Sequence, residues 1–595
     1  MAKGQQSNRG GGLPQRPKDW KYVFRKLGFY LKQQKAGLAL GLFLMLVSNI
    51  AGLFGPRLSG LAIDQMTGGT GSVNFPGVLK YSGLMLGVYL FVSVSTFFLS
   101  RLMVRVSQSM VYQMRKDLYN HLVDLPVSFY GRHQAGDIIS RMSYDIDTIN
   151  TSLTNDIIQI GGSVITVFGS LLMMLSISPV LSLVFAITIP VSVIFTRYRT
   201  KKVQPLFSRR SRKLGEMNAY VEEIISGLRT IKVYQQEDSF IESFDEKNLA
   251  AAEAYYNADY WGTMTGPSVN FINNMSLVLV SMFGSILFFL GRIALGDFSA
   301  FVLYSRRFSG PINEMANILS DLQSAASAAE RVFRLIDEPI EAADPADSVV
   351  LSDVKGDVDI EDLSFSYIPG IPIITKLNLH AKAGQVVAIV GETGAGKTTL
   401  INLLMRFYDP DSGEIRIDDL PMEQITRESG RRAFAMVLQD TWLFQGTVHD
   451  NIAYAQPDAT RKDVIAAAVT AHADSFIRRL PQGYDTVLVG GGQSLSQGQK
   501  QLLTIARAML LDARMLILDE ATSHVDTGTE KLISAAMNQL MEGKTSFVIA
   551  HRLSTIQDAD LILVIEDGEI REQGTHESLL AADGVYAALY QAQFA

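Results

Sequence analysis

Long apolar stretches separated by polar segments dominate the first half of the chain. Six of these stretches are long enough for a helix to cross roughly 30 Å of hydrocarbon, and the last is the weakest. They lie near residues 37–61, 78–103, 156–176, 178–198, 270–292 and 297–323. The pattern therefore predicts an α-helical membrane domain with six transmembrane helices.

Positive charge sets the predicted orientation of these helices. The first 36 residues contain nine Lys and Arg, whereas residues 58–79 contain none. Cytoplasmic loops of membrane proteins are enriched in Lys and Arg, so the N-terminus is predicted to lie in the cytoplasm. Residues 1–20 are polar and rich in Gly, which is typical of a disordered tail.

Two polar segments between the spans, 104–155 and 199–269, are basic and carry a helical pattern. Both are far longer than an ordinary connection of about five residues. They predict helices that continue past the membrane surface by some 20 residues, or roughly 30 Å, before turning back. We expect these extensions to contact a cytosolic partner or domain.

The second half of the chain has a different pattern. An acidic, Pro-punctuated stretch is followed by short β-rich runs that alternate with helical stretches, which is typical of an α/β domain with a mainly parallel sheet. The predicted organisation is a tail at 1–20, a membrane domain with two cytosolic excursions at 21–331, a linker at 332–355 and an α/β domain at 356–595.

The strongest local motif is GETGAGKT at 391–398, which follows the strand QVVAIV and precedes a helical stretch. This is the phosphate-loop pattern, in which backbone N–H groups at a helix N-terminus surround a phosphate. Lys397 would neutralise the β- and γ-phosphate oxygens, and the Thr398 hydroxyl would bind Mg²⁺. The predicted nucleotide-binding residues here are Gly391, Glu392, Thr393, Gly394, Ala395, Gly396, Lys397, Thr398 and Thr399.

Two further strands end in residues suited to phosphate chemistry. MLILDE ends with Asp519, which could hold the Mg²⁺ water shell, and Glu520, which could orient or deprotonate the attacking water. The strand in SFVIAH ends with His551. No other histidine stands at metal-ligand spacing from it, which disfavours a chelating role. Its place after a core strand predicts a position near the phosphates.

Composition narrows the function classes. Hydrophobic residues make up 47% of the chain and charged residues 19%, in agreement with a part embedded in lipid. The net charge of −7 gives no general affinity for nucleic acid. The chain contains no cysteine, which excludes disulfides, thiolate metal sites and a cysteine nucleophile.

Taken together, the motifs resemble those of an ATP-binding cassette (ABC) exporter half-transporter, over the whole chain and in that family's order. They are Tyr367 in SFSY, GETGAGKT, Gln439 in VLQDTWLFQGTV, LSQGQ at 495–499, LILDE, SHVD and His551. The resemblance implies ATP and Mg²⁺ as cofactors, with Tyr367 stacked on adenine and Gln439 sensing Mg²⁺ and the γ-phosphate. It also implies that Lys397, Glu520 and His551 are catalytic and that Thr398, Gln439 and Asp519 hold Mg²⁺.

The resemblance further implies a setting for the protein. Residues 129–149 and 219–238 look like the coupling segments that dock on nucleotide-binding domains. The expected location is the inner (plasma) membrane of a bacterium, as a multi-pass protein with its nucleotide-binding domain in the cytoplasm. The expected substrate is a hydrophobic or amphipathic small molecule, such as a drug, a lipid or a peptide.

In this family each ATP lies between the phosphate loop of one chain and the signature of another, so a second half-transporter is needed. Ser496 opens a helix, and its hydroxyl with the N–H groups through Gly498 and Gln499 would form an anion site. Gln497 replaces the usual glycine of LSGGQ and could crowd the partner's nucleotide. Intact catalytic residues beside LSQGQ resemble the competent subunit of bacterial heterodimeric multidrug exporters. A heterodimer is therefore favoured, with a homodimer as the alternative.

Other functions stay open. An importer resembling siderophore systems could use the same frame, since sequence does not separate the two directions. The fused spans argue against a soluble ATPase, and the intact catalytic residues argue against a regulator without transport. Arg306 and Arg307 lie about 12 Å into the last span, and charges at that depth usually face a water-filled cavity. They suggest anionic or amphipathic cargo as a hypothesis.

Overall fold

The computed structural model describes residues 17, 19–67, 73–439, 441–519, 526–550 and 556–594. Most of the predicted tail, together with Glu520, His524 and His551, lies outside the described residues. The chain forms two compact units. One comprises Met1–Leu125 and His133–Ile340, and the other comprises Pro126–Arg132 and Glu341–Ala595.

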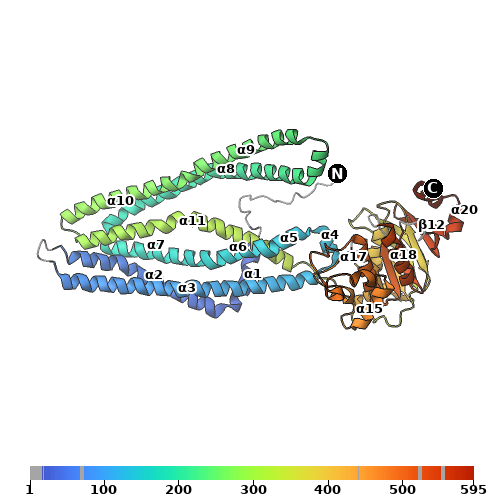
Figure 1. The fold of residues 1–595 in the computed structure, drawn as a ribbon. Helices are drawn as coiled ribbons and strands as arrows, with labels where there is room; N and C mark the ends of the chain where they lie inside the picture. The colour runs from blue at the N-terminus through green and yellow to red at the C-terminus, as the bar shows by residue number, and fades with distance from the viewer. Residues whose placement is uncertain are drawn as a thin grey trace. The chain divides into compact units, whose positions relative to one another are not determined.

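The first unit is built from long helices that lie side by side (Figure 1). Its α-helices are α1 (Trp20–Gln33), α2 (Lys35–Asp64), α3 (Phe75–Val123), α5 (Ala135–Ser140), α6 (Ile146–Thr151), α7 (Ile157–Ile177), α8 (Pro179–Val233), α9 (Glu237–Thr263), α10 (Thr265–Phe289) and α11 (Leu295–Ile336). Two π-helical turns, η1 (Arg141–Asp145) and η2 (Ser152–Asp156), join α5, α6 and α7 into one continuous rod.

The predicted spans fall within these helices. The first five lie in α2, α3, α7, α8 and α10, and the described chain contains 5 helical stretches that are long and apolar enough to cross a membrane. The sixth span lies in α11, which is a helix of 42 residues but is not one of those stretches. Arg306, Arg307 and Glu314 lower its hydropathy, in keeping with the weaker apolar run in the sequence.

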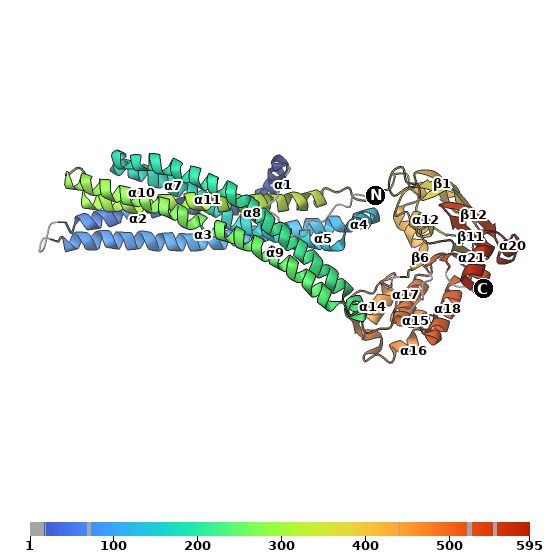
Figure 2. The ribbon, with the colours of Figure 1, turned by 90° about the horizontal axis from the view of Figure 1, so that it is seen from above.

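Helix length explains how the helices extend beyond a bilayer. The 55 residues of α8 correspond to about 83 Å at 1.5 Å per residue, so more than half of α8 exceeds a 30 Å hydrocarbon core. The chain then reverses through Tyr234–Gln236, where Gln235 adopts a positive φ of 51°. Helix α9 returns alongside α8 (Figure 2). This reversal lies within the second predicted coupling segment.

Helix α11 is fixed against α2 by polar contacts at several depths. The Tyr304 hydroxyl donates to the Leu53 carbonyl at 2.5 Å, and Arg307 donates to the Gly52 carbonyl at 2.5 Å. Arg57 forms an ion pair with Asp297 near the N-terminal end of α11. The two neighbouring arginines in this span differ, because Arg307 donates to α2 and Arg306 is exposed.

The second unit is an α/β domain with two main sheets. One has the strand order β12-β11-β3-β10-β9-β6, and the other has the order β2-β1-β4-β5. In the first sheet every neighbouring pair is parallel except β11 and β12. The strands are β1 (Val358–Phe365), β2 (Ile374–Ala381), β3 (Val386–Val390), β4 (Ser412–Ile417), β5 (Leu420–Pro421), β6 (Phe434–Val437), β7 (Gly446–Thr447), β8 (Val487–Leu488), β9 (Met515–Asp519), β10 (Thr545–Ile549), β11 (Leu561–Glu566) and β12 (Glu569–Gly574).

The α-helices described in this unit after β1 are α12 (Lys397–Leu404), α13 (Arg427–Arg432), α14 (Val448–Ala453), α15 (Arg461–Thr470), α16 (Asp474–Ile477), α17 (Gln497–Leu511), α18 (Thr527–Met541), α20 (His576–Ala581) and α21 (Val585–Phe594). Helix α12 on one side and α17 and α18 on the other contribute to the two cores that flank the parallel sheet. Strand β3 shows why two cores form: Val387 and Ile389 pack into one, while Ala388 and Val390 pack into the other. Alternate side chains of a strand face opposite sides of the sheet. This buried sheet carries the predicted phosphate-binding residues at its carboxyl edge.

The segment before β1 is tied to the α/β unit by ion pairs. Both carboxylate oxygens of Glu341 accept from Arg431, at 2.5 and 3.0 Å, and Asp344 pairs with Arg427 at 3.2 Å. The hydrogen bonds from Arg431 hold the pKa of Glu341 below its ordinary value. The pair is partly exposed, so its contribution to stability is expected to be about 1 kcal/mol.

A pH-dependent stability follows from this carboxylate. A carboxyl group with a lowered pKa in the folded chain stabilises above its unfolded pKa of about 4.3, and the effect fades as pH falls through the folded value. We expect Glu341→Gln to lower the melting temperature of the purified chain at pH 7. The difference should shrink below about pH 4.3. Thermal unfolding at several pH values measures it, and an equal difference at pH 7 and pH 3.5 would contradict the assignment.

Candidate functional site

The loop between β3 and α12 has the geometry of an anion cradle. Gly394 and Gly396 have positive φ angles of 93° and 108°, and Gly396 is the N-cap of α12. A Cβ on Gly391 would lie 2.2 Å from the carbonyl oxygen of Ile565 on β11. These positions therefore favour glycine, and the loop leads directly into the N-terminus of α12, where N–H groups without a helical partner can bind an anion.

Lys397 spans this loop. Its Nζ donates to the carbonyl oxygens of Gly391 and Glu392, both at 2.8 Å. Burial lowers the pKa of the Lys397 ammonium, and the charge of Asp519 acts in the opposite direction. A partly buried ammonium beside a helix N-terminus is suited to hold a polyphosphate. Thr398 is exposed next to it, whereas Thr399 is buried beneath the loop.

The parallel topology brings Asp519 to the same edge. Asp519 is the last residue of β9, and β10 pairs with both β9 and β3 in parallel. The exposed Gln439 follows β6, which pairs with the other side of β9. Oxygen ligands such as these suit Mg²⁺. Asp519 thus ends β9, Gln439 follows β6, and Thr398 lies in α12 after the loop that leaves β3. All three lie at or after the carboxyl ends of strands in one sheet. Their role in binding Mg²⁺ stays a prediction.

An aromatic cluster marks the predicted adenine site. Tyr367 is 44% exposed and lies edge-on to Phe365 and Tyr408, with ring centroids 4.9 and 5.0 Å away. Asn402, on α12, donates to the Tyr367 hydroxyl at 3.1 Å. The free face of Tyr367 can accept a base, and Asn402 connects it to the phosphate helix. Sequence reasoning missed Tyr408 and Asn402.

A short helix from the first half of the chain belongs to this unit. Helix α4 (Val127–Arg132) overlaps the first predicted coupling segment, and it groups with the α/β domain. A Cβ on Gly131 would lie 3.4 Å from the Tyr408 hydroxyl. Tyr408 therefore lies between α4 and Tyr367. This contact lies within the second unit.

The signature region is ordered by its own helix cap. The Ser496 hydroxyl accepts from the Gln499 N–H at 3.2 Å, and the Gln499 side chain accepts from the Ser496 N–H at 3.0 Å. Gly498 is buried in the first turn of α17. In the part of the chain that the structure describes, no hydrogen bond or ion pair joins residues 495–499 to the loop 391–398. The two sets of predicted residues are therefore not connected within one chain.

Gln497 makes a contact of its own. Its Nε2 donates to the Thr441 hydroxyl at 3.3 Å, two residues after Gln439. Both partners are at the surface, so the bond is weak and the side chain stays accessible. Gly490, shortly before the signature, has a positive φ of 59°, which glycine adopts more easily than residues with a side chain.

Comparison with known proteins agrees with this architecture. The family model described as ABC transporter transmembrane region matches residues 38–312, and the model described as ABC transporter matches residues 374–523. The protein named uncharacterized ABC transporter ATP-binding protein YfiC, from Bacillus subtilis (strain 168), is 42% identical over 577 residues, which cover 97% of this chain and 95% of that protein.

Two further comparisons cover most of the chain. The fatty acid ABC transporter ATP-binding/permease protein of Mycobacterium tuberculosis (strain CDC 1551 / Oshkosh) is 42% identical over 533 residues, which cover 90% of this chain and 84% of that protein. A solved structure of a bacterial Atm1-family ABC exporter with ATP bound matches with a TM-score of 0.75 and 29% identity, covering 95% of this chain and 99% of that one. The predicted resemblance and fold class are confirmed.

Proposed function

The chain belongs to the ABC transporter family as an exporter-type half-transporter whose α/β domain couples ATP hydrolysis to transport, and from this premise we propose a more specific role. The protein exports an amphipathic anion from the cytoplasm across a bacterial inner membrane, as one half of a heterodimer that holds the hydrolytic ATP. Arg306 is the observation that carries the substrate class, and Gln497 supports the heterodimer.

Arg306 is an exposed charge within the last predicted span. It has no ion-pair or hydrogen-bond partner among the described residues, whereas the neighbouring Arg307 donates to α2. An arginine that faced lipid at this depth would be costly, so Arg306 is expected to face a water-filled cavity or a second half-transporter. Leu303 and Gly310 are exposed on the same face. An apolar surface beside one guanidinium suits an acyl chain with an acidic headgroup, and one relative is named for fatty acids.

Substitution of Arg306 tests this substrate class. In lipid nanodiscs, Arg306→Ala is expected to raise the concentration of laurate that half-maximally stimulates ATPase by about fivefold, or roughly 1 kcal/mol. The response to the uncharged methyl ester should not change. Arg292→Ala, which removes another exposed arginine of the same unit, is the matched control. Equal laurate responses of the parent and Arg306→Ala would contradict an anionic headgroup at this position.

The heterodimer rests on the signature. In the family each nucleotide lies between two chains, so Gln497 of this chain would face the partner's ATP. Its side chain occupies space that glycine leaves open, while the loop that holds this chain's own ATP keeps Lys397. A different partner with a glycine in its signature would complete the competent site. This arrangement gives one hydrolytic and one impaired nucleotide site.

Gln497→Gly should therefore have a small effect. We expect the ATP turnover of the complex to change by no more than about threefold, which corresponds to less than 1 kcal/mol. Thr441→Val removes the hydrogen-bond partner of Gln497 and keeps the Gln497 side chain. It therefore separates the effect of the hydrogen bond from the effect of the size of Gln497. Steady-state ATPase measurements test both variants. A loss of turnover as large as that of a catalytic variant would overturn the proposed asymmetry.

A further inference from the structure

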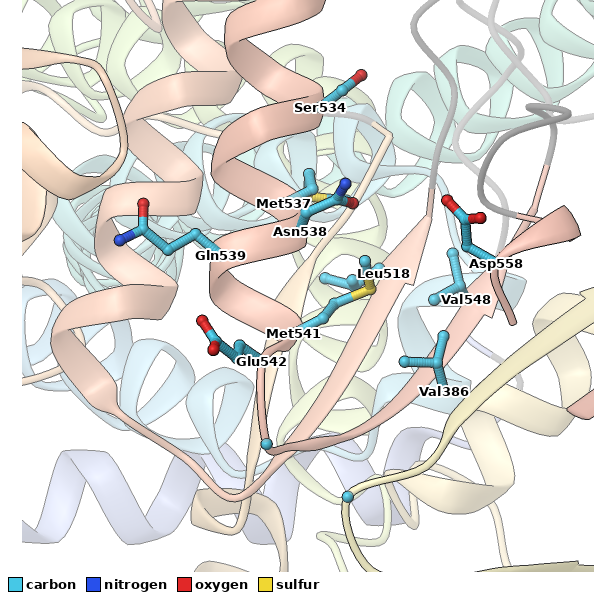
Figure 3. A pocket seen from close by; sticks show the side chains of 12 residues that line it. Val386, Leu518, Ser534, Met537, Asn538, Gln539, Met541, Glu542, Val548 and Asp558 are labelled. Carbon is cyan, nitrogen blue, oxygen red and sulfur yellow. The ribbon is translucent and has the colours of Figure 1, made fainter. Parts of the chain in front are cut away.

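A cavity of about 470 Å³ lies in the α/β domain beneath α18, apart from the loop that carries Lys397. Its volume is in the range of small-molecule sites. Figure 3 shows Met537 and Met541 of α18 on one side of the cavity, and Val386, Val548 and Asp558 on the other. Val386, the first residue of β3, is only partly buried and lines the cavity.

The lining combines an apolar floor with acidic groups. Leu518, Met537 and Val548 are buried side chains of the floor, and methionine adapts readily to the shape of a bound molecule. Glu542 and Asp558 lie in the wall and are exposed. Among the described residues neither carboxylate has a hydrogen-bond or ion-pair partner, and the described lining includes no Lys or Arg.

We propose that this cavity binds a compact amphipathic cation, with an aromatic or aliphatic body on the methionine floor and an ammonium group beside Glu542 or Asp558, which lie at opposite ends of the cavity (Figure 3). Carboxylates in a lining whose described residues include no Lys or Arg attract a cation and repel an anion. The occupant therefore differs in charge from the proposed transport substrate, and the proposal depends only on the ATPase activity of the family.

Occupancy is expected to act on ATP hydrolysis. Leu518 directly precedes Asp519, and Val548 lies on the strand that leads to His551. A ligand that wedges against both strands would bias the positions of their carboxyl ends without entering the nucleotide loop. It should therefore lower the maximal rate and leave the KM for ATP unchanged.

The test uses the complex that contains the full chain, in lipid nanodiscs, with 2-(2-naphthyl)ethylamine as the probe. We expect the amine to lower kcat at least twofold and to slow hydrogen exchange in Thr527–Met541. The isosteric alcohol should act at least threefold more weakly. The double variant Glu542→Gln/Asp558→Asn should need at least a threefold higher amine concentration, whereas Glu577→Gln, an exposed control on α20, should respond as the parent does.

Filling the cavity gives an independent check. Met537→Trp should retain basal ATPase and lose the response to the amine. Because Met537 is buried, the substitution could unfold α18, and hydrogen exchange of the variant without the amine reports whether the helix stays folded. If α18 unfolds in this variant, the double variant Glu542→Gln/Asp558→Asn still tests the site. An identical amine response in the parent and the double variant would overturn the proposal. So would protection confined to the membrane helices, which would assign the effect to the transport pathway.

Discussion

Replacing Glu520 with Gln is expected to lower the ATP turnover of the complex at least 100-fold while ATP still binds. Glu520 follows Asp519, the last residue of β9, and β10 lies between β9 and β3, the strand that leads into the Lys397 loop. A carboxylate there can orient or deprotonate the attacking water, and an amide of the same size cannot accept its proton. A loss of 100-fold corresponds to about 2.7 kcal/mol of transition-state stabilisation.

Steady-state phosphate release from the purified complex measures this loss, with nucleotide binding measured in parallel. Glu423→Gln, which changes an exposed carboxylate outside the predicted nucleotide-binding and catalytic residues, is the matched control and should leave turnover unchanged. Turnover of Glu520→Gln at the parent level would show that the assigned hydrolytic residue is wrong.

Replacing Lys397 with Ala is expected to weaken ATP binding itself. The substitution removes the ammonium that lies against the carbonyl oxygens of Gly391 and Glu392 and that would contact the phosphates. Charge-assisted hydrogen bonds of this kind contribute about 1.5–3 kcal/mol each, so the Kd for ATP should rise by at least about tenfold.

Equilibrium binding of a fluorescent ATP analogue separates this variant from Glu520→Gln. The lysine variant should lose binding and turnover together, whereas the glutamate variant should lose turnover alone. Lys382→Ala, at an exposed lysine outside the loop, is the control. If Lys397→Ala bound the analogue as tightly as the parent does, the loop would not be the nucleotide site.

The sequence predicted those parts of the fold that depend on a local pattern of apolar and polar residues. Apolar length defines a span directly, and each predicted span falls in a helix of the structure. The extension of α8 and the reversal near Gln235 follow from the length of the polar segment. The π-helical turns η1 and η2 were not predicted, because they depend on packing between helices and leave no periodic signal.

The candidate site shows the same division. The loop 391–398 was predictable because the strand, the glycines and the helix are contiguous. Asn402 and Tyr408 were not, because they meet Tyr367 only after two sheets and a helix have assembled. The contact of Gly131 with Tyr408 joins segments more than 270 residues apart in the chain. An aromatic residue shortly after a phosphate-loop helix is the weak signal that could have suggested Tyr408.

The central claim is that this chain works beside an unlike partner and supplies the competent ATP site. Native mass spectrometry of the complex isolated from its own host tests it most directly. The account predicts one assembly that contains the 595-residue chain and a second, different ABC half-transporter in equal amounts. A complex that contains two copies of this chain and nothing else, with full transport activity, would contradict it.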